Sequence, residues 1–292
     1  MESELLLRID CTLGETPVVL PGSNELAWID AVEGRLHILP PGAEQPETIA
    51  VPGQAPLGMV MATSQPGMLL VSCKDGIVLL DRTTGKTTPF AHPLHSLPHL
   101  FYNDGKVDSL GRLWIGTAED SESAPRGILF RMDGTRAVPV DAGLAVCNGP
   151  AITGAGDRLY LSDSTEGRIH TYRIDAEGRL LDRRLFVQMT RDEGLPDGVT
   201  LDNEDCLWVA HWGGGCVSRY APDGTLQARV ELPVPLVTSL CFGGDDNRQL
   251  FITTARVDLD AGALAQAPLS GSLFTLRAEV AGPPAPVLKL PA

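Results

Sequence analysis

The chain lacks the features that mark a nucleic-acid-binding or membrane protein. Its 23 Lys and Arg are outnumbered by 37 Asp and Glu, which gives a formal net charge of −14. DNA, RNA and anionic lipid surfaces are bound through a basic face, and this composition offers none. A membrane-spanning helix needs about 18 or more consecutive apolar residues, and no such run occurs. We therefore expect neither a nucleic-acid nor a membrane partner.

Export signals and disulfide patterns are also missing. The segment from Met1 to Arg8 has neither a basic start nor a long apolar stretch, so we expect a cytoplasmic protein. The six cysteines are scattered, without any C-x-x-C pair. This spacing favours buried free thiols over disulfides or a structural zinc site. The composition leaves the choice between a monomer and a dimer open.

Aromatic residues are scarce, at 5%, whereas Gly (31) and Pro (23) are plentiful. That composition suits many short strands joined by tight turns, with few helices. An apolar strand that begins with Leu recurs six times, at intervals of 43 to 48 residues: Leu26, Leu69, Leu113, Leu159, Leu207 and Leu250. A period in the forties built from short strands is typical of propeller blades. The repeat predicts an all-β fold, a six-bladed β-propeller of four-stranded blades that forms a single domain over residues 1–292.

The remaining strands of each blade follow from the residues around the Leu run. A Gly and a second apolar run come after it, as at 34–38 and 76–80, and turns such as Asp133-Gly134 lead to a more polar outer strand. The innermost strand should precede the Leu run. We expect segment 5–9 to be an extra edge strand that closes the ring against the last blade, because closure hides a free sheet edge.

Polar residues recur ten or eleven residues before the Leu, where the innermost strand should begin at the axis. Two repeats have Met59 and Leu240 there, and four have a carboxylate or carboxamide: Glu15, Asn103, Asn148 and Asp197. Two carboxylates and two amides that converge on a channel repel one another unless a cation lies between them. The all-oxygen donor set favours one divalent cation such as Ca²⁺, Mg²⁺ or Mn²⁺ and leaves Zn²⁺ and Fe²⁺ open. The sequence therefore predicts a central metal site.

Five motifs occur in order along nearly the whole chain: Gly14-Glu-Thr-Pro17, Asn103-Asp-Gly-Lys-Val-Asp108, Asn148-Gly149, Pro196-Asp-Gly198 and Leu207-Trp-Val-Ala-His-Trp-Gly-Gly214. In these motifs the chain resembles the regucalcin/gluconolactonase (senescence marker protein, sugar lactonase) family of six-bladed propellers. Members of this family are mostly metal-dependent hydrolases of sugar lactones. The resemblance implies that Glu15, Asn148 and Asp197 bind the catalytic metal. It also implies that Asn103 lies beside the metal and contacts the substrate or a coordinated water.

The resemblance predicts a metal-dependent hydrolase that opens a sugar lactone of the aldonolactone type, or a related small lactone. Metal ions polarise carbonyl groups and lower the pKa of water, and Asp197 is the expected general base. The chain has no G-x-S-x-G motif and no Ser or Cys that pairs persuasively with a His, which agrees with a mechanism without a covalent nucleophile. Two alternatives remain: an organophosphate or aryl-ester hydrolase on the same scaffold, and a calcium-binding propeller without catalysis.

Specificity should be set by loops on the face where the innermost strands begin. We expect Glu119 or Asp120 to reach a sugar hydroxyl. Trp212 would offer a flat apolar wall to a sugar ring and His211 a hydrogen bond, unless both merely close a strand end. Many relatives carry Arg at the substrate-contacting position of Phe101, and an apolar ring cannot replace a guanidinium fork, so a common aldonolactone substrate is put in doubt. The rim should also include Asp30 and the segments 91–102, 119–126, 163–164 and 256–270.

The rim segment 92–99 contains three imidazoles, those of His92, His95 and His99. Imidazole is a favoured ligand for Zn²⁺. Pro93 and Pro98 disfavour a helix that would align the rings, however, and the segment holds no acidic residue. We favour a flexible lid over a second metal site.

Overall fold

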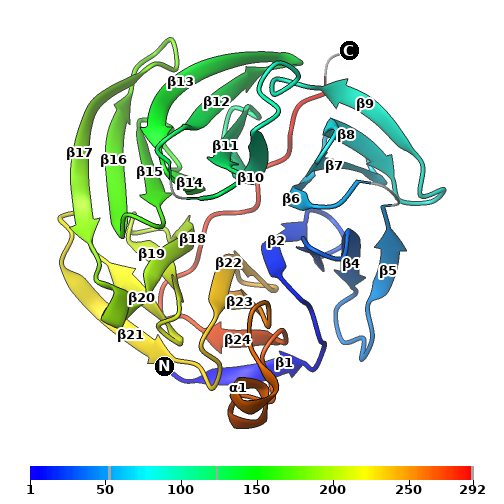
Figure 1. Cartoon of the computed structure of the whole chain (residues 1–292), viewed down its shortest axis with the longest axis vertical. Helices are drawn as coiled ribbons and strands as arrows, with labels where there is room; N and C mark the ends of the chain where they lie inside the picture. The colour runs from blue at the N-terminus through cyan, green and yellow to red at the C-terminus, as the bar shows by residue number, and fades with distance from the viewer. Residues whose placement is uncertain (52–53, 123, 291–292) are drawn as a thin grey trace.

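The computed structural model describes residues 1–51, 54–122 and 124–290 and contains six four-stranded sheets, which form a ring about a central axis (Figure 1). All six sheets are antiparallel; five are meanders that run outward from the axis, and the sixth takes its outermost strand from the start of the chain. In the first blade the order is β2 (Gly14–Leu20), β3 (Glu25–Asp30), β4 (Arg35–Leu39) and β5 (Glu47–Ala50). The six-bladed propeller predicted from the Leu repeat is confirmed.

The other blades have the same arrangement outward from the axis, and in the described part of the chain helical structure is confined to short pieces. The bounds are β6 (Leu57–Ala62), β7 (Met68–Cys73), β8 (Gly76–Asp81) and β9 (Thr87–Ala91) in the second blade; β10 (Leu100–Val107), β11 (Leu113–Glu119), β12 (Gly127–Asp133) and β13 (Arg136–Leu144) in the third; β14 (Cys147–Ile152), β15 (Arg158–Asp163), β16 (Arg168–Ile174) and β17 (Leu180–Gln188) in the fourth; β18 (Leu195–Leu201), β19 (Leu207–Trp212), β20 (Cys216–Tyr220) and β21 (Leu226–Glu231) in the fifth; and β22 (Val237–Gly243), β23 (Gln249–Thr254), β24 (Leu273–Arg277) and β1 (Ser3–Leu7) in the sixth. The helical pieces are η1 (Arg191–Glu193) and α1 (Ala261–Gln266).

The first strand of the chain closes the ring. β1 pairs antiparallel with β24 and is the regular fourth strand of the sixth blade, so the predicted role in closure holds but the strand is not an extra one. Its bounds are 3–7 rather than the predicted 5–9. A register shift between Leu5 and Leu7 leaves Leu5 44% exposed while Leu7 is buried, so the two side chains do not share the face that simple alternation predicts.

The repeated Leu residues are buried because they lie in the second strand of every blade, between the sheets of neighbouring blades. Each is at most 4% exposed. Burying a side chain of this kind stabilises a fold by about 1.5–3 kcal/mol. Two buried tryptophans of the same strands donate their indole N–H to buried carboxylates: Trp114 to Asp108 at 2.9 Å and Trp208 to Asp202 at 3.0 Å. The repeat is therefore the pattern of the inter-blade core.

All six cysteines are buried and free, which confirms the interpretation of their spacing. Burial raises the pKa of several of these thiols, for example that of Cys73 to about 11. Such thiols stay protonated near neutral pH and are poor nucleophiles. Within the described part of the chain, no helix has the length and apolar character needed to cross a bilayer.

The chain continues past the last blade as a C-terminal segment, 281–290, which crosses the end of the channel opposite to the starts of the innermost strands (Figure 1). Its backbone is hydrogen-bonded to four blades. In the second and third blades, the backbone N–H groups of Leu288 and Lys289 donate to the carbonyls of Ala62 at 2.9 Å and Gly111 at 3.1 Å. In the fifth blade, the N–H of Asn203 donates to the carbonyl of Ala281 at 2.9 Å, and in the sixth the N–H of Gly282 donates to the carbonyl of Asn247 at 2.7 Å. The segment thus ties blades together and covers one end of the channel.

Candidate functional site

Every innermost strand loses its regular pairing shortly after it begins. In four blades the pairing skips two residues: between Glu15 and Val18 in β2, Tyr102 and Gly105 in β10, Asn148 and Ala151 in β14, and Pro196 and Val199 in β18. The other two have shorter shifts, between Leu57 and Met59 in β6 and between Val237 and Ser239 in β22. Bulges of this kind turn side chains out of the regular alternation. The motifs that look like turns in the sequence are bulged strands in the structure.

Small residues make these irregular strands fit together. Gly149 has a φ of 79°, a conformation that residues with a Cβ rarely adopt. At Gly198 an added Cβ would lie 2.7 Å from the Cβ of Ser239, on the innermost strand of the next blade. The glycines that follow Asn148 and Asp197 are therefore required by backbone conformation in one blade and by close packing in the other.

The bulges bring the predicted polar residues to one cavity, the upper cavity, at the end of the channel where the innermost strands begin. Glu15, Asn103, Asn148 and Asp197 all line this space of about 150 Å³. Asn148 and Asp197 are 7% and 5% exposed. Four residues that are far apart in the sequence therefore share one site, each on the innermost strand of its own blade.

Hydrogen bonds across the junctions between blades hold these side chains in place. Nδ2 of Asn148 donates to Oδ1 of Asp197, and Nδ2 of Asn103 donates to the carbonyl of Cys147 at 3.2 Å. The backbone carbonyl of Asp197 accepts from the hydroxyl of Ser162 at 3.0 Å. Each bond joins residues of adjacent blades, so the packing of the ring fixes the geometry of the site.

The carboxyl groups of the site are short of positive charge. Burial, together with repulsion from Asp104, raises the pKa of Glu15 to about 8. Burial, followed by repulsion from Glu15 and Asp104, raises the pKa of Asp197 well above its usual range. The carboxyl groups of Glu15, Asp104 and Asp197 form no ion pair within 4 Å among the described residues. Lys106 is nevertheless near enough to lower the pKa of Glu15 and of Asp104. A cation between the carboxylates would remove this repulsion.

The donor set fits a hard divalent cation. Glu15, Asn148 and Asp197 offer two carboxylates and one amide, all through oxygen, which are the groups that Ca²⁺, Mg²⁺ and Mn²⁺ prefer. Nowhere in the described residues do three or more His, Cys, Asp or Glu side chains gather into a metal-binding group. The candidate site therefore depends on Asn148 for its third donor.

Two acidic residues that line the upper cavity or act on its carboxyl groups were not predicted as site residues: Glu122 lines the cavity, and Asp104 raises the pKa values of Glu15 and Asp197 without lining it. Asp104 is 4% exposed, its Oδ1 accepts from the backbone N–H of Gly105 at 2.6 Å, and burial raises its pKa to about 6. A fixed offset from the Leu repeat selects one residue in each blade, whereas the bulge of β10 leaves two residues, Asn103 and Asp104, outside the regular pairing. The offset therefore did not indicate Asp104. Glu122 lines the upper cavity, and desolvation raises its pKa. It falls in the predicted rim segment 119–126, of which residue 123 lies outside the described residues.

Trp212 and His211 are neighbours in β19 but lie in different surroundings. Trp212 lines the upper cavity and is half-buried. His211 is 1% exposed and does not line this cavity. Its Nδ1 lies 2.7 Å from the backbone carbonyl of Glu193, and its Nε2 has no hydrogen-bond partner among the described residues. Asp30 and Asp163 take the equivalent place in their blades, and their carboxylates accept backbone N–H groups from residues just before the innermost strand. All three residues thus secure the entry to that strand.

Phe101 and Glu119 are at the rim and do not line the upper cavity. Phe101 is half-buried and pairs with Ala118 in the ladder between β10 and β11. The carboxylate of Glu119 accepts from the backbone N–H of Ser121 at 3.0 Å and lies 3.8 Å from Arg126. The hydrogen bonds from Ser121 lower the pKa of Glu119. Its carboxylate is therefore engaged by its own loop.

The segment 92–99 is hydrogen-bonded to the hydroxyl of Tyr102 near its start. Nδ1 of His92 lies 3.2 Å from the hydroxyl of Tyr102, and the same hydroxyl accepts from the backbone N–H of Leu94 at 3.1 Å. The rings of His92 and His95 meet edge to face, with centroids 5.7 Å apart. His99 forms no metal-binding group with them in the described structure. A lid role for this segment stays a prediction.

Comparison with known proteins gives consistent matches along the chain. Residues 13–256 match the family model described as the SMP-30/gluconolactonase/LRE-like region. The 6-deoxy-6-sulfogluconolactonase of Pseudomonas putida is 35% identical over 279 residues, which cover 95% of each chain. Pentonolactonase XacC of Haloferax volcanii is 34% identical over 282 residues, 94% of each chain. The solved structure of a calcium-binding protein, regucalcin, from Agrobacterium tumefaciens str. C58 aligns with a TM-score of 0.92 at 30% identity, over 98% of this chain and 97% of its own.

Proposed function

Because the chain belongs to the SMP-30/gluconolactonase/LRE-like family, we propose that it is a metal-dependent lactonase that opens a small sugar lactone to the hydroxy acid. The observation that carries the proposal is the upper cavity, where Glu15, Asn148 and Asp197 offer oxygen donors and where, among the described residues, neither carboxyl group has an ion-pair partner within 4 Å. Relatives named for gluconolactone- and pentonolactone-type activities support a sugar lactone as the substrate class. A sugar lactone also suits a cavity of about 150 Å³ that has polar donors and one aromatic wall.

Glu15, Asn148 and Asp197 would hold the cation, since all three reach the same cavity from the innermost strands of the first, fourth and fifth blades. When bound, a divalent cation supplies a Lewis acid for the lactone carbonyl and lowers the pKa of water. Ca²⁺, Mg²⁺, Mn²⁺, Zn²⁺ and Fe²⁺ are the candidates, with the hard ions favoured by the oxygen donors. The positive charge would also offset the repulsion between Glu15 and Asp197 and keep both carboxylates ionised.

Asp197 is the proposed general base. The hydrogen bond from Asn148 engages Oδ1 and orients the carboxylate, so Oδ2 is the atom that can take a proton from the attacking water. The water oxygen then bonds to the carbonyl carbon and the bond to the ring oxygen breaks. Asp197 returns the proton to that departing oxygen, which becomes the hydroxyl of the product. One water is consumed, and no covalent nucleophile is needed.

The rest of the cavity would position the sugar. Nδ2 of Asn103 is engaged by Cys147, which leaves the amide oxygen of Asn103 to accept from a substrate hydroxyl. Trp212 provides an apolar wall for the ring. Phe101 and Glu119 lie at the rim, so contact with them would involve the part of the substrate farthest from the carbonyl. His211 would act indirectly, through the strand that carries Trp212.

A pH-indicator screen of hydrolysis tests the proposed substrate class. The panel contains γ- and δ-aldonolactones, simple lactones of the same ring sizes and phosphotriesters, each with individual divalent ions. We expect sugar lactones to be hydrolysed fastest and simple lactones more slowly, because they lack the hydroxyls that Asn103 would bind. Absence of lactone turnover with every ion would contradict the proposal.

A calcium-binding propeller without catalysis is the second candidate. The likeness to a solved regucalcin that is described as a calcium-binding protein favours it. Calorimetric titration with Ca²⁺ separates the two candidates. Tight calcium binding together with no hydrolysis of any lactone would support this second function, whereas turnover that depends on the bound ion would support the first.

A further inference from the structure

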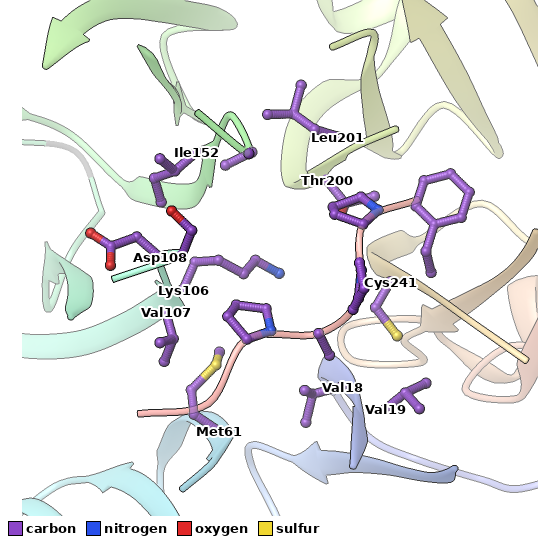
Figure 2. A pocket seen from close by; sticks show the side chains of 18 of the residues that line it. Val18, Val19, Met61, Lys106, Val107, Asp108, Ile152, Thr200, Leu201 and Cys241 are labelled. Atoms are coloured by element: carbon purple, nitrogen blue, oxygen red, sulfur yellow. The ribbon is translucent and has the colours of Figure 1, made fainter. Parts of the chain in front are cut away.

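A second cavity, the lower cavity, lies at the opposite end of the channel (Figure 2). Its volume is about 130 Å³. All six innermost strands contribute to it through residues that come after the bulges, such as Val18 in β2 and Cys241 in β22. The C-terminal segment, through residues 283–286, completes the wall. The lower cavity is thus bounded by the ring on its sides and by this segment at its end, and it stays partly open to solvent.

The wall of the lower cavity is mainly apolar. Its larger side chains include Met61, Ile152, Leu201 and Phe242, and the C-terminal segment adds three prolines and Ala285. Such surfaces favour hydrocarbon over a polyhydroxylated sugar. The products expected from the upper cavity, sugar acids with many hydroxyls, are therefore poor candidates for this space.

One cationic side chain extends into the lower cavity. Figure 2 shows the side chain of Lys106 reaching from β10 into the space between the strands and the C-terminal segment. Within the described residues, Lys106 has no side-chain hydrogen bond and no ion pair within 4 Å. Lys106 is half-buried, so water solvates its charge only in part, and an anion that entered the cavity would provide the ion-pair partner that it lacks.

None of the charged groups described near Lys106 is its ion-pair partner. Asp108 also lines the cavity, but its carboxylate accepts from the side chains of Arg112 at 2.8 Å and Trp114 at 2.9 Å and from two backbone N–H groups. Asp104 and Glu15 face Lys106 from the side of the upper cavity, at more than ion-pair distance. The ammonium group is therefore open to a ligand from the lower side.

We propose that the lower cavity binds a small monocarboxylate with an apolar body. Its carboxylate would pair with Lys106, and its hydrocarbon part would contact the apolar wall and the prolines of the C-terminal segment. A cavity of about 150 Å³ holds a molecule the size of benzene, so a body of about five or six carbons fits the space. This site is separate from the upper cavity and does not depend on the proposed lactonase activity.

Hexanoate is the probe for this site. Its binding to the whole chain is measured by calorimetric titration and by thermal unfolding. We expect hexanoate to bind the wild-type protein with one site and to raise Tm. The Lys106→Met variant, which keeps a similar side-chain volume, should bind at least about tenfold more weakly, about 1.4 kcal/mol. The control is Lys74→Met, which removes an exposed lysine remote from the cavity lining and should bind like the wild type.

Two comparison ligands separate charge from apolar contact. Hexan-1-ol has the apolar body without the charge, and acetate has the charge without the body, so both should bind more weakly than hexanoate. Equal affinity for hexanoate and hexan-1-ol, or an unchanged hexanoate affinity in Lys106→Met, would overturn the proposal. Absence of hexanoate binding to the wild type at millimolar concentration would overturn it as well.

Two further variants keep the test decisive if Lys106→Met fails to fold. Thr200→Leu retains Lys106 but fills part of the lower cavity, and it should weaken hexanoate binding. Trp212→Ala alters the upper cavity without changing its charge and should retain hexanoate binding. Unchanged affinity in Thr200→Leu, or loss of binding in Trp212→Ala, would contradict the assignment to the lower cavity.

Discussion

Asn148 donates a hydrogen bond from its amide nitrogen to Oδ1 of Asp197, across the junction between the fourth and fifth blades. Both residues lie at bulges of innermost strands, where the regular pairing is interrupted. The bond orients a buried carboxylate that has no ion-pair partner among the described residues. A side chain held in this way is suited to bind a cation and to accept a proton.

Replacing the buried carboxylates should separate activity from stability. We expect Glu15→Gln and Asp197→Asn to lower kcat by about a thousandfold or more. In chelator both variants should have a higher Tm than the wild type, because each removes a buried carboxyl that burial and repulsion disfavour. The control is Asp192→Asn, an exposed residue of η1. Wild-type activity in either variant would remove that residue from the proposed site.

The cation-free protein should lose stability as the pH rises from about 4.5 to about 8. The pKa of Glu15 in the folded state is raised from 4.5 to about 8, and that of Asp197 is raised as well. Over this window the folded state holds protons that the unfolded chain has already released, so the free energy of unfolding falls with increasing pH, by about 1.4 kcal/mol for each unit of pKa shift. Urea unfolding in chelator across this window measures the slope.

The same pH series has an internal control. Glu15→Gln cannot release the proton and should show a flatter dependence than the wild type. Addition of a cation that binds should also flatten the wild-type curve, since protons and cations compete for the same oxygens. A wild-type slope that is unchanged by both the substitution and the cation would contradict the assigned pKa of Glu15.

Close packing at the bulge of β18 should make Gly198 essential. In Gly198→Ala the new Cβ would lie 2.7 Å from the Cβ of Ser239, so the strand must shift. We expect a loss of about 1–3 kcal/mol in the free energy of unfolding, as for other overpacked sites, and a strong loss of kcat because Asp197 is the preceding residue. Gly154→Ala is the matched control, because no atom lies within 4 Å of its added Cβ. Similar behaviour of the two variants would contradict the packing argument.

Trp212 and His211 should have different effects when they are replaced. Trp212→Ala removes a wall of the upper cavity and should raise KM by about tenfold, with little change in stability. His211→Gln disturbs a buried ring and its contact with Glu193, so it should lower Tm and leave KM unchanged. Steady-state kinetics and thermal unfolding of both variants measure the difference. The reverse outcome would place His211 in the substrate site.

The fold could be predicted from the sequence because every blade needs an apolar second strand, and the repeated Leu residues mark these strands. Residues such as Leu113 and Leu207 lie in the second strand of their blades and must be buried between neighbouring sheets. The same period located four axial residues, since equal offsets in equivalent blades lead to equivalent places. The role of β1 in closing the ring could be inferred, but its bulge at Leu5 could not, because local register depends on the partner strand.

Other features left no periodic signal. Asp104 lies near enough to Glu15 and Asp197 to raise their pKa values because the bulge of β10 leaves two residues unpaired, and bulge length is set by pairing rather than by residue type. Glu122 lies in an insertion, outside the repeat. The C-terminal segment has no strand pattern in its sequence. Its path across the end of the channel and its place in the wall of the lower cavity therefore depend on tertiary packing.

Metal removal and restoration test the central claim most directly. Lactone hydrolysis is followed with the protein as purified, after treatment with a chelator, and after stoichiometric return of each divalent ion, with bound metal measured by mass spectrometry. We expect activity to disappear in chelator and to return with one ion per chain, and Glu15→Gln to neither bind the ion nor recover. Full lactone hydrolysis by the metal-free protein would contradict the proposed role of Glu15, Asn148 and Asp197.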